Sequence, residues 1–170
     1  IIGSLIGSAI TYALLKNNIV NSENKVVKYE IEATNSPVVQ IAEKAGPSIV
    51  GVRVSYMTQN FFGSLQEADE EGSGIIYKED GYIITNYHVV ESAVNNSSAK
   101  VVITLPNSEE ELPASIVGVD VATDLAVVKV DKKGLVPAEM GQSSELKVGE
   151  IAVAIGNPLG QEFAGSVTVG

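Results

Sequence analysis

The residue with the clearest capacity for chemistry is His88, the only histidine in the chain. A neutral imidazole can take a proton from a hydroxyl nucleophile, and a carboxylate on its other ring nitrogen can fix the tautomer and stabilise the imidazolium. The chain has no cysteine, which excludes a thiol nucleophile, disulfides and cysteine-based zinc sites. A single histidine also makes a multi-histidine metal site implausible, so we expect neither a metal nor a cofactor. The candidate chemistry is base catalysis by His88.

Two aspartates compete for the role of the orienting carboxylate. Asp124 begins an Asp-Leu-Ala-Val segment, and its distance from His88 along the chain leaves room for two or three strands between them. Asp120 follows Gly118-Val119 and could instead supply a carboxylate from a turn. A lone histidine is more often a structural or surface residue than a catalyst, so residue type alone does not decide the role of His88.

The elements that would position these side chains are short strands. From residue 48 onward, β-branched and apolar runs alternate with turn-forming residues. The runs cover residues 49–54, 74–77, 82–85, 101–105, 116–119, 125–130 and 151–155. Many short strands without helical periods between them predict an all-β barrel or sandwich. Asp80-Gly81 indicates a hairpin, since this pair accepts the positive φ angles of tight turns, and it places His88 just past the end of a hairpin strand.

Two other segments differ from this strand pattern. Residues 36–47 begin with Ser-Pro and end with Gly-Pro, the chemistry of a helix start and a helix stop, so they predict a short helix that docks on the barrel. Residues 56–71 contain a Phe-Phe pair and an acidic run. This span is too long for a hairpin turn, and we expect an exposed loop there.

The beginning of the chain has a different composition. Residues 1–15 carry no charge, and roughly 20 apolar residues are needed to cross a bilayer. We predict part of a transmembrane anchor over residues 1–16, with a signal-peptide core or a buried helix as alternatives, and a polar linker over residues 17–35. The net charge of −10 would repel a polyanion, so no nucleic-acid partner is expected.

Four segments carry a family resemblance. They are residues 72–76 (GSGII), 81–90 (GYIITNYHVV), 123–130 (TDLAVVKV) and 148–160 (VGEIAVAIGNPLG). In this order they resemble the HtrA/DegP (Deg, Do-like) branch of the chymotrypsin-fold serine proteases, and the resemblance covers about residues 37–170. It implies that His88 is the base of a catalytic triad and that Asp124, rather than Asp120, is the orienting carboxylate.

The resemblance also implies a fold and a cellular role. We expect an all-β, chymotrypsin-like barrel: a short helix and the first protease barrel over residues 36–146, and the start of the second barrel over residues 147–170. The implied parent is a membrane-anchored serine endopeptidase of stress response and protein quality control, with its protease domain on the extracytoplasmic side of the cell membrane. Its expected substrates are misfolded or exported proteins. Trimers are common in the family, and Phe61-Phe62 is either a candidate contact between protomers or part of a plain exposed loop.

The sequence departs from the family pattern at the nucleophile. The family carries its serine in a Gly-Asn-Ser-Gly-Gly motif, which does not occur here. Ser73 lies between glycines but precedes His88, whereas the family order is His, Asp, Ser; Ser166 lacks the glycines that should follow it. We therefore expect the nucleophile beyond Gly170 and no activity from this chain alone. The alternatives are a non-catalytic, peptide-binding or self-assembling barrel module and, from residues 1–15 alone, a membrane scaffold.

Overall fold

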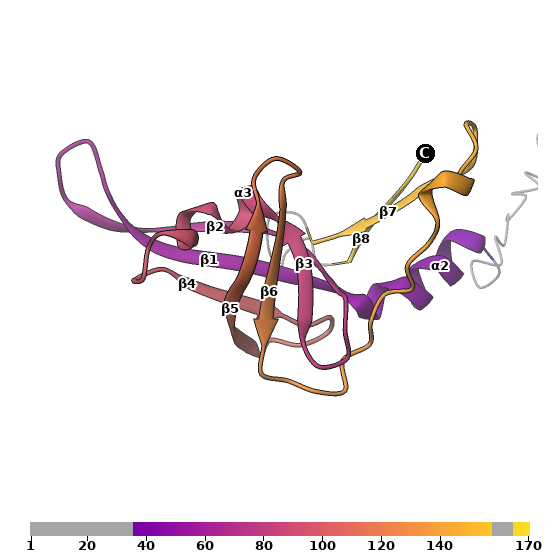
Figure 1. Cartoon of the computed structure of the whole chain (residues 1–170), viewed down its shortest axis with the longest axis horizontal. Coiled ribbons are helices and arrows are strands. Elements are labelled where there is room, and N and C mark those ends of the chain that lie inside the picture. Colours follow the sequence, from indigo (N-terminus) through magenta and orange to yellow (C-terminus); the bar gives the residue numbers. More distant parts are fainter. Residues whose placement is uncertain (1–35, 158–164) are drawn as a thin grey trace, which may run out of the picture. The chain divides into compact units, whose positions relative to one another are not determined.

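The computed structural model describes residues 36–157 and 165–170 (Figure 1). Its elements are α2 (Pro37–Ala45), η2 (Gly46–Ser48), β1 (Ile49–Gln59), β2 (Leu65–Ile76), β3 (Tyr82–Asn86), α3 (Tyr87–Val94), β4 (Lys100–Thr104), β5 (Glu111–Asp120), β6 (Leu125–Val130), η3 (Ser143–Glu145), β7 (Val153–Gly156) and β8 (Ser166–Val169). The predicted anchor and linker, residues 1–16 and 17–35, lie outside the described residues. Within the described part of the chain, neither α2 nor α3 has the length and apolar character that crossing a bilayer requires.

Six strands form a closed antiparallel barrel in the order β1-β2-β3-β6-β5-β4 (Figure 1). The predicted all-β barrel is confirmed, and so is the short helix before it, which is α2. The hairpin predicted at Asp80-Gly81 joins β2 to β3. β3 ends at Asn86, and α3 begins at the next residue, Tyr87. The last two strands, β7 and β8, pair with each other in a separate two-stranded sheet.

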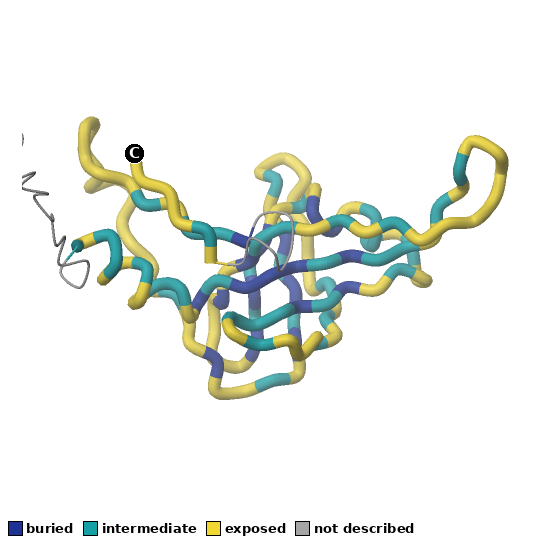
Figure 2. Tube along the Cα trace, turned by 180° about the vertical axis from the view of Figure 1, so that it is seen from behind, coloured by how far each residue is buried: buried dark blue, intermediate teal, exposed yellow. Residues whose placement is uncertain are grey.

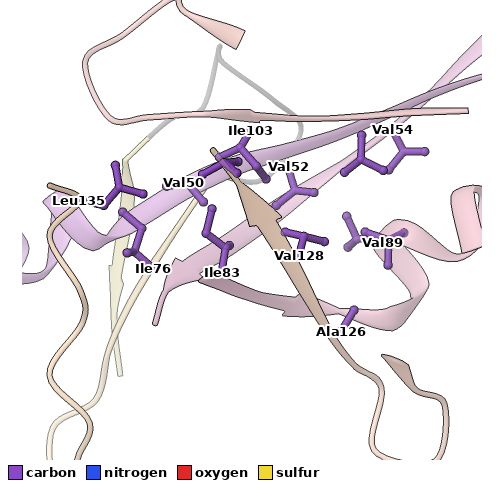
Figure 3. Packing of buried hydrophobic residues seen from close by; sticks show 13 residues of the cluster. Val50, Val52, Val54, Ile76, Ile83, Val89, Ile103, Ala126, Val128 and Leu135 are labelled. Carbon is purple, nitrogen blue, oxygen red and sulfur yellow. The ribbon is translucent and has the colours of Figure 1, made fainter. Parts of the chain in front are cut away.

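The barrel core consists of small and medium aliphatic side chains. They are Val50, Val52, Val54, Ile76, Ile83, Val89, Val90, Val101, Ile103, Ala126, Val128, Val130 and Leu135 (Figure 3). Alternate residues of β1 and of β6 point inward, as the period of two along a strand requires. Burying one Val or Ile side chain contributes roughly 1.5–3 kcal/mol, so this cluster provides much of the stability that holds the strand ends in place.

The prediction of a loop over residues 56–71 is wrong. β1 and β2 remain paired from Ile49 opposite Ile75 to Gln59 opposite Leu65, and only the tip between them is a turn. Toward the tip both faces of this two-stranded ribbon are exposed, as at Met57 and Leu65, so its strands need no hydrophobic alternation there. Nearer the barrel the half-buried Tyr56 and Glu70 form a polar pair across the ribbon. Figure 2 shows the exposed tip, where Phe61 is 97% exposed.

The helix α3 is a second difference, because we expected no helix between the strands. It has eight residues and buries Val89 and Val90 against the barrel. Eight residues are too few for a clear helical period, and adjacent β-branched residues resemble a strand in the sequence. The helix begins where β3 ends, so His88 lies in its first turn.

Gly81 closes the β2–β3 hairpin in a conformation that other residues rarely adopt. Its φ is +102°, and a Cβ at this position would lie 2.3 Å from the Val130 carbonyl oxygen. We expect Gly81→Ala to lower the free energy of unfolding by about 3 kcal/mol, measured by urea denaturation. Gly134→Ala is the matched control, because Gly134 has φ +74° but open space around it. It should cost only about 1 kcal/mol, and equal losses in the two variants would contradict the role of the close approach.

Candidate active site

The pairing of β3 with β6 brings the two predicted site residues together. In this register Asn86, the last residue of β3, lies opposite Leu125, the first residue of β6. His88 and Asp124 lie just outside this pair, at the same end of the barrel. The Asp124 carboxylate contacts His88 twice: Oδ2 lies 2.8 Å from the ring Nδ1, and Oδ1 accepts a hydrogen bond of 2.9 Å from the His88 backbone N–H.

Asp124 also caps the helix that carries His88. The first backbone N–H groups of a helix have no partner within the helix. In α3 the Tyr87 N–H donates to the Asp124 carbonyl oxygen at 3.1 Å, and the His88 N–H donates to the Asp124 carboxylate. A carboxylate at this end is also favoured by the positive end of the helix dipole. The same contacts that hold α3 in place therefore fix the imidazole relative to the carboxylate.

The backbone of Asp124 has a conformation that few residue types tolerate. Its φ is +55°, the left-handed region, where aspartate and asparagine are the commonest residues after glycine. The residue ends the turn between β5 and β6, and its N–H donates to the Val121 carbonyl oxygen at 3.4 Å. This turn directs both the carbonyl and the carboxylate of Asp124 toward the start of α3.

Asn86 is a site residue to which we assigned no role from the sequence. Its side-chain Nδ2 donates to the Asp124 carbonyl oxygen at 3.2 Å and to Oδ2 at 3.1 Å. Asn86 occupies the position before α3 where an asparagine side chain ordinarily caps its own helix, yet it makes no capping bond there. An asparagine two residues before a candidate histidine was the available signal. Its partner across the barrel was not visible in the sequence.

The structure does not bring Asp120 into this arrangement. The Asp120 Oδ1 accepts a hydrogen bond of 3.0 Å from the Ala122 backbone N–H, two residues further along the same turn. A hydrogen bond from the Thr123 side chain, followed by that from the Ala122 N–H, lowers the pKa of Asp120. Asp120 therefore stabilises the β5–β6 turn, and Asp124 is the aspartate in contact with His88.

The electrostatics of the pair suit a base and its orienting group. Hydrogen bonds from the His88 backbone N–H and then from its side chain lower the pKa of Asp124 below the ordinary 3.8. Asp124 is thus an anion at neutral pH. In the tautomer that carries the ring proton on Nδ1, Nδ1–H donates a hydrogen bond to Oδ2, and Nε2 can accept a proton from another group. The His88 side chain is 67% exposed, so a reacting group can reach it. Within residues 36–157 and 165–170, no group of His, Asp and Glu side chains is arranged to hold a metal.

The lowered pKa of Asp124 predicts acid-sensitive stability. The folded-state pKa lies below the unfolded one, so the contribution is complete above about pH 4 and is lost as the pH falls through the folded value. The difference in free energy of unfolding between wild type and Asp124→Asn should be constant near neutral pH and shrink below pH 4. Denaturant titrations at several pH values measure it. A difference that grows on acidification would contradict the assignment.

Ser73 and Ser166, the two serines considered as nucleophiles, both lie in places where they contribute to packing or strand pairing. Ser73 Oγ accepts a hydrogen bond of 2.7 Å from the Asn157 backbone N–H, which attaches the end of β7 to the barrel. The glycine that follows it, Gly74, packs so tightly that a Cβ would lie 2.8 Å from Ile83. Ser166 is the first residue of β8 and pairs with Gly156. The Gly-Ser-Gly segment thus serves packing and attachment.

Comparison with known proteins agrees with this geometry. Residues 72–170 match the family described as "Trypsin-like peptidase domain". The chain is 41% identical over 164 residues to "Serine protease Do-like HtrB" of Bacillus subtilis, covering 91% of this chain and 34% of that protein. It is 42% identical over 117 residues to "Probable periplasmic serine endoprotease DegP-like" of Ectopseudomonas mendocina, covering 69% of this chain and 23% of that protein.

A solved structure is similar as well. It is a variant of the HtrA-type protease AlgW with a decapeptide, which superposes with a TM-score of 0.69 at 26% identity and covers 79% of this chain and 44% of that chain. The six-stranded barrel and the matches together define the class: the chain belongs to the trypsin-like peptidases. Within that class, its relatives and its fold are those of the HtrA/DegP serine proteases. The chain spans about a third or less of the two curated relatives named above.

Proposed function

We propose that this chain supplies the base and the orienting carboxylate of an HtrA/DegP-like serine endopeptidase. The observation that carries the proposal is the double contact of Asp124 with His88, to the ring Nδ1 at 2.8 Å and to the backbone N–H at 2.9 Å. In the reaction Nε2 of His88 takes the proton of a serine hydroxyl as that oxygen attacks the peptide carbonyl, and then gives the proton to the leaving amine. Asp124 stabilises the imidazolium formed between these steps.

The proposal requires a serine from further sequence. No serine of the 170 residues lies in a Gly-Asn-Ser-Gly-Gly motif, whose backbone N–H groups would also stabilise the oxyanion. We interpret β7 and β8 as the start of the second barrel that would carry this motif. This chain by itself should therefore show no stoichiometric labelling with a fluorophosphonate probe for active-site serines. Stoichiometric labelling would mean that one of its own serines is the nucleophile.

A chimera tests the function directly. This chain replaces the aligned segment of Bacillus subtilis HtrB, with which it is 41% identical, so that the remainder of HtrB supplies the serine. We expect the chimera to cleave an unfolded substrate such as casein within about tenfold of the native HtrB rate, since the two base-and-carboxylate pairs would be equivalent. A folded chimera that does not cleave casein would contradict the proposal.

The cellular setting is part of the same proposal. The uncharged residues 1–15 support membrane anchoring of the parent, and the periplasmic name of the Ectopseudomonas mendocina relative supports a protease domain outside the cytoplasm. Misfolded or exported proteins are the proposed substrates, and a trimer the proposed assembly. Deleting residues 1–16 should move the parent from the membrane to the soluble fraction, and an unchanged distribution would contradict anchoring.

A second candidate function is self-assembly without catalysis. It is favoured by exposed apolar side chains near β7: Leu146 is 72% exposed and Ile151 79% exposed. Such side chains can mediate association between copies. Sedimentation velocity of this chain and of a Leu146→Ser, Ile151→Ser variant separates the two candidates. Concentration-dependent oligomers that disappear in the variant, together with an inactive chimera, would favour assembly.

A further inference from the structure

Glu70 of β2 is a half-buried carboxylate that the proposed chemistry does not use. Its Oε1 accepts two hydrogen bonds, from the Tyr56 hydroxyl of β1 at 3.0 Å and from the Ser92 hydroxyl of α3 at 2.8 Å. Its Oε2 is buried and has no hydrogen-bond partner. An unpaired buried carboxylate oxygen is costly, and an apolar side chain would avoid the cost if packing were the only requirement. Such a group calls for a functional explanation.

Ser92 connects Glu70 to the helix that carries His88. Ser92 follows His88 by four residues, about one turn of α3, and residues with this spacing lie on the same side of a helix. The start of α3 is held by Asp124 through the backbone N–H groups of Tyr87 and His88. Glu70 holds the next turn. One anchor comes from the β5–β6 turn and the other from strand β2, so together they restrict rotation of the helix about its axis.

The helix α3 packs closely against strand β2. Gly72 lies two residues after Glu70 and therefore on the same face of β2. A Cβ at Gly72 would lie 2.7 Å and 2.9 Å from the two methyl groups of Val89. The missing side chain allows the helix to approach closely enough for Ser92 to reach Glu70. Any shift of α3 on this surface would move His88, which precedes Val89.

We propose that Glu70 is a positioning residue for His88. The proposal rests on the function proposed above, in which His88 is the base. By binding Ser92 on one side and Tyr56 on the other, Glu70 fixes α3 against the β1–β2 hairpin and keeps the His88 ring aligned with Asp124. Without this anchor α3 is held by its first turn and by apolar packing alone. Small displacements matter in such sites, since an error of 1 Å can cost about 100-fold in rate.

Nuclear magnetic resonance on the full 170-residue chain tests the proposal without an activity assay. Because His88 is the only histidine, its ring signals identify themselves. We expect Glu70→Ala to speed amide hydrogen exchange at His88 roughly tenfold, because the hydrogen bond from Ser92 to the carboxylate is lost. The same variant should weaken the low-field Nδ1–H signal. Ser92→Ala should do the same. Glu70→Gln, whose amide oxygen still accepts from both hydroxyls, should restore wild-type behaviour.

Glu67→Ala is the matched control, because Glu67 is an exposed glutamate of the same strand; it should leave His88 unchanged. Wild-type exchange and ring signals in Ser92→Ala would overturn the proposal, even if Glu70→Ala failed to fold. Exchange in Glu70→Gln as fast as in Glu70→Ala would overturn it too. The NMR measurement reports the His88–Asp124 geometry, whereas casein cleavage by the chimera reports the proposed function. The Glu70 proposal can therefore be overturned while the chimera is active, and it can hold while the chimera is inactive.

Discussion

His88→Ala in the HtrB chimera should abolish cleavage of casein, with kcat falling about 10⁶-fold, a loss of the size measured when the base of a serine protease is removed. In the proposed mechanism Asp124, whose Oδ2 lies 2.8 Å from His88 Nδ1, accepts a hydrogen bond from Nδ1–H, and Nε2 is the atom that takes the serine proton. Without the imidazole, the attacking hydroxyl has no group to receive its proton. Single-turnover kinetics on a chromogenic peptide measure the effect on the chemical step.

The same variant should remain folded. The His88 side chain is 67% exposed and is not part of the core, and alanine at position 88 keeps the backbone N–H that donates to Asp124. We expect an unchanged circular dichroism spectrum and a Tm within about 3 °C of the parent. Glu91→Ala, another exposed position on α3, is the control for the helix and should keep full activity. Loss of fold in His88→Ala would count against a catalytic role.

Asp124→Asn should lower kcat about 10⁴-fold, the magnitude known for the equivalent exchange in chymotrypsin-fold proteases. Asparagine tolerates the φ of +55° at this position, so the β5–β6 turn should persist. The His88 backbone N–H keeps the side-chain oxygen as its acceptor, which directs the amide group toward the ring Nδ1. Nδ1 must then accept a hydrogen bond, and the ring proton moves to Nε2, the atom that has to receive the serine proton.

Two comparisons check this explanation. Asp120→Asn, in the same turn, should keep activity within about threefold, since Asp120 bonds to Ala122 rather than to His88. In Asp124→Asn the loss should appear in kcat with little change in KM, because the carboxylate stabilises charge that forms only during the reaction. Full activity of Asp124→Asn together with an inactive Asp120→Asn would transfer the role to Asp120.

The sequence alone determined several particulars of this chain. The β-branched runs predicted the barrel strands, because alternation and branching at Cβ reflect a strand with one buried face. Asp80-Gly81 predicted the β2–β3 hairpin, which the structure confirms. The ordered motifs identified the HtrA/DegP resemblance and singled out His88 and Asp124, while the catalytic roles of these two residues stay predictions. Local chemistry was sufficient for the strands and the hairpin, whereas the choice of His88 and Asp124 rested on the family resemblance.

Other features depended on contacts between distant residues. The acidic residues of β2 were interpreted as a loop because composition cannot show that Tyr56 and Ser92 bind Glu70. The helix α3 was missed because it is short and rich in β-branched residues. Asn86 received no role because its partner is Asp124, on a different hairpin.

The His88–Asp124 site illustrates what the sequence determines and what the tertiary structure determines. The residue types of His88 and Asp124 are written in the sequence, and they define which chemistry is possible. Their contact depends on the register that sets Asn86 opposite Leu125, on the left-handed turn at Asp124 and on the start of α3 beside it. Register and helix placement are decided by packing of the whole barrel, since each is stabilised by residues far apart in the chain. Only the tertiary structure could therefore make a pair of these two residues.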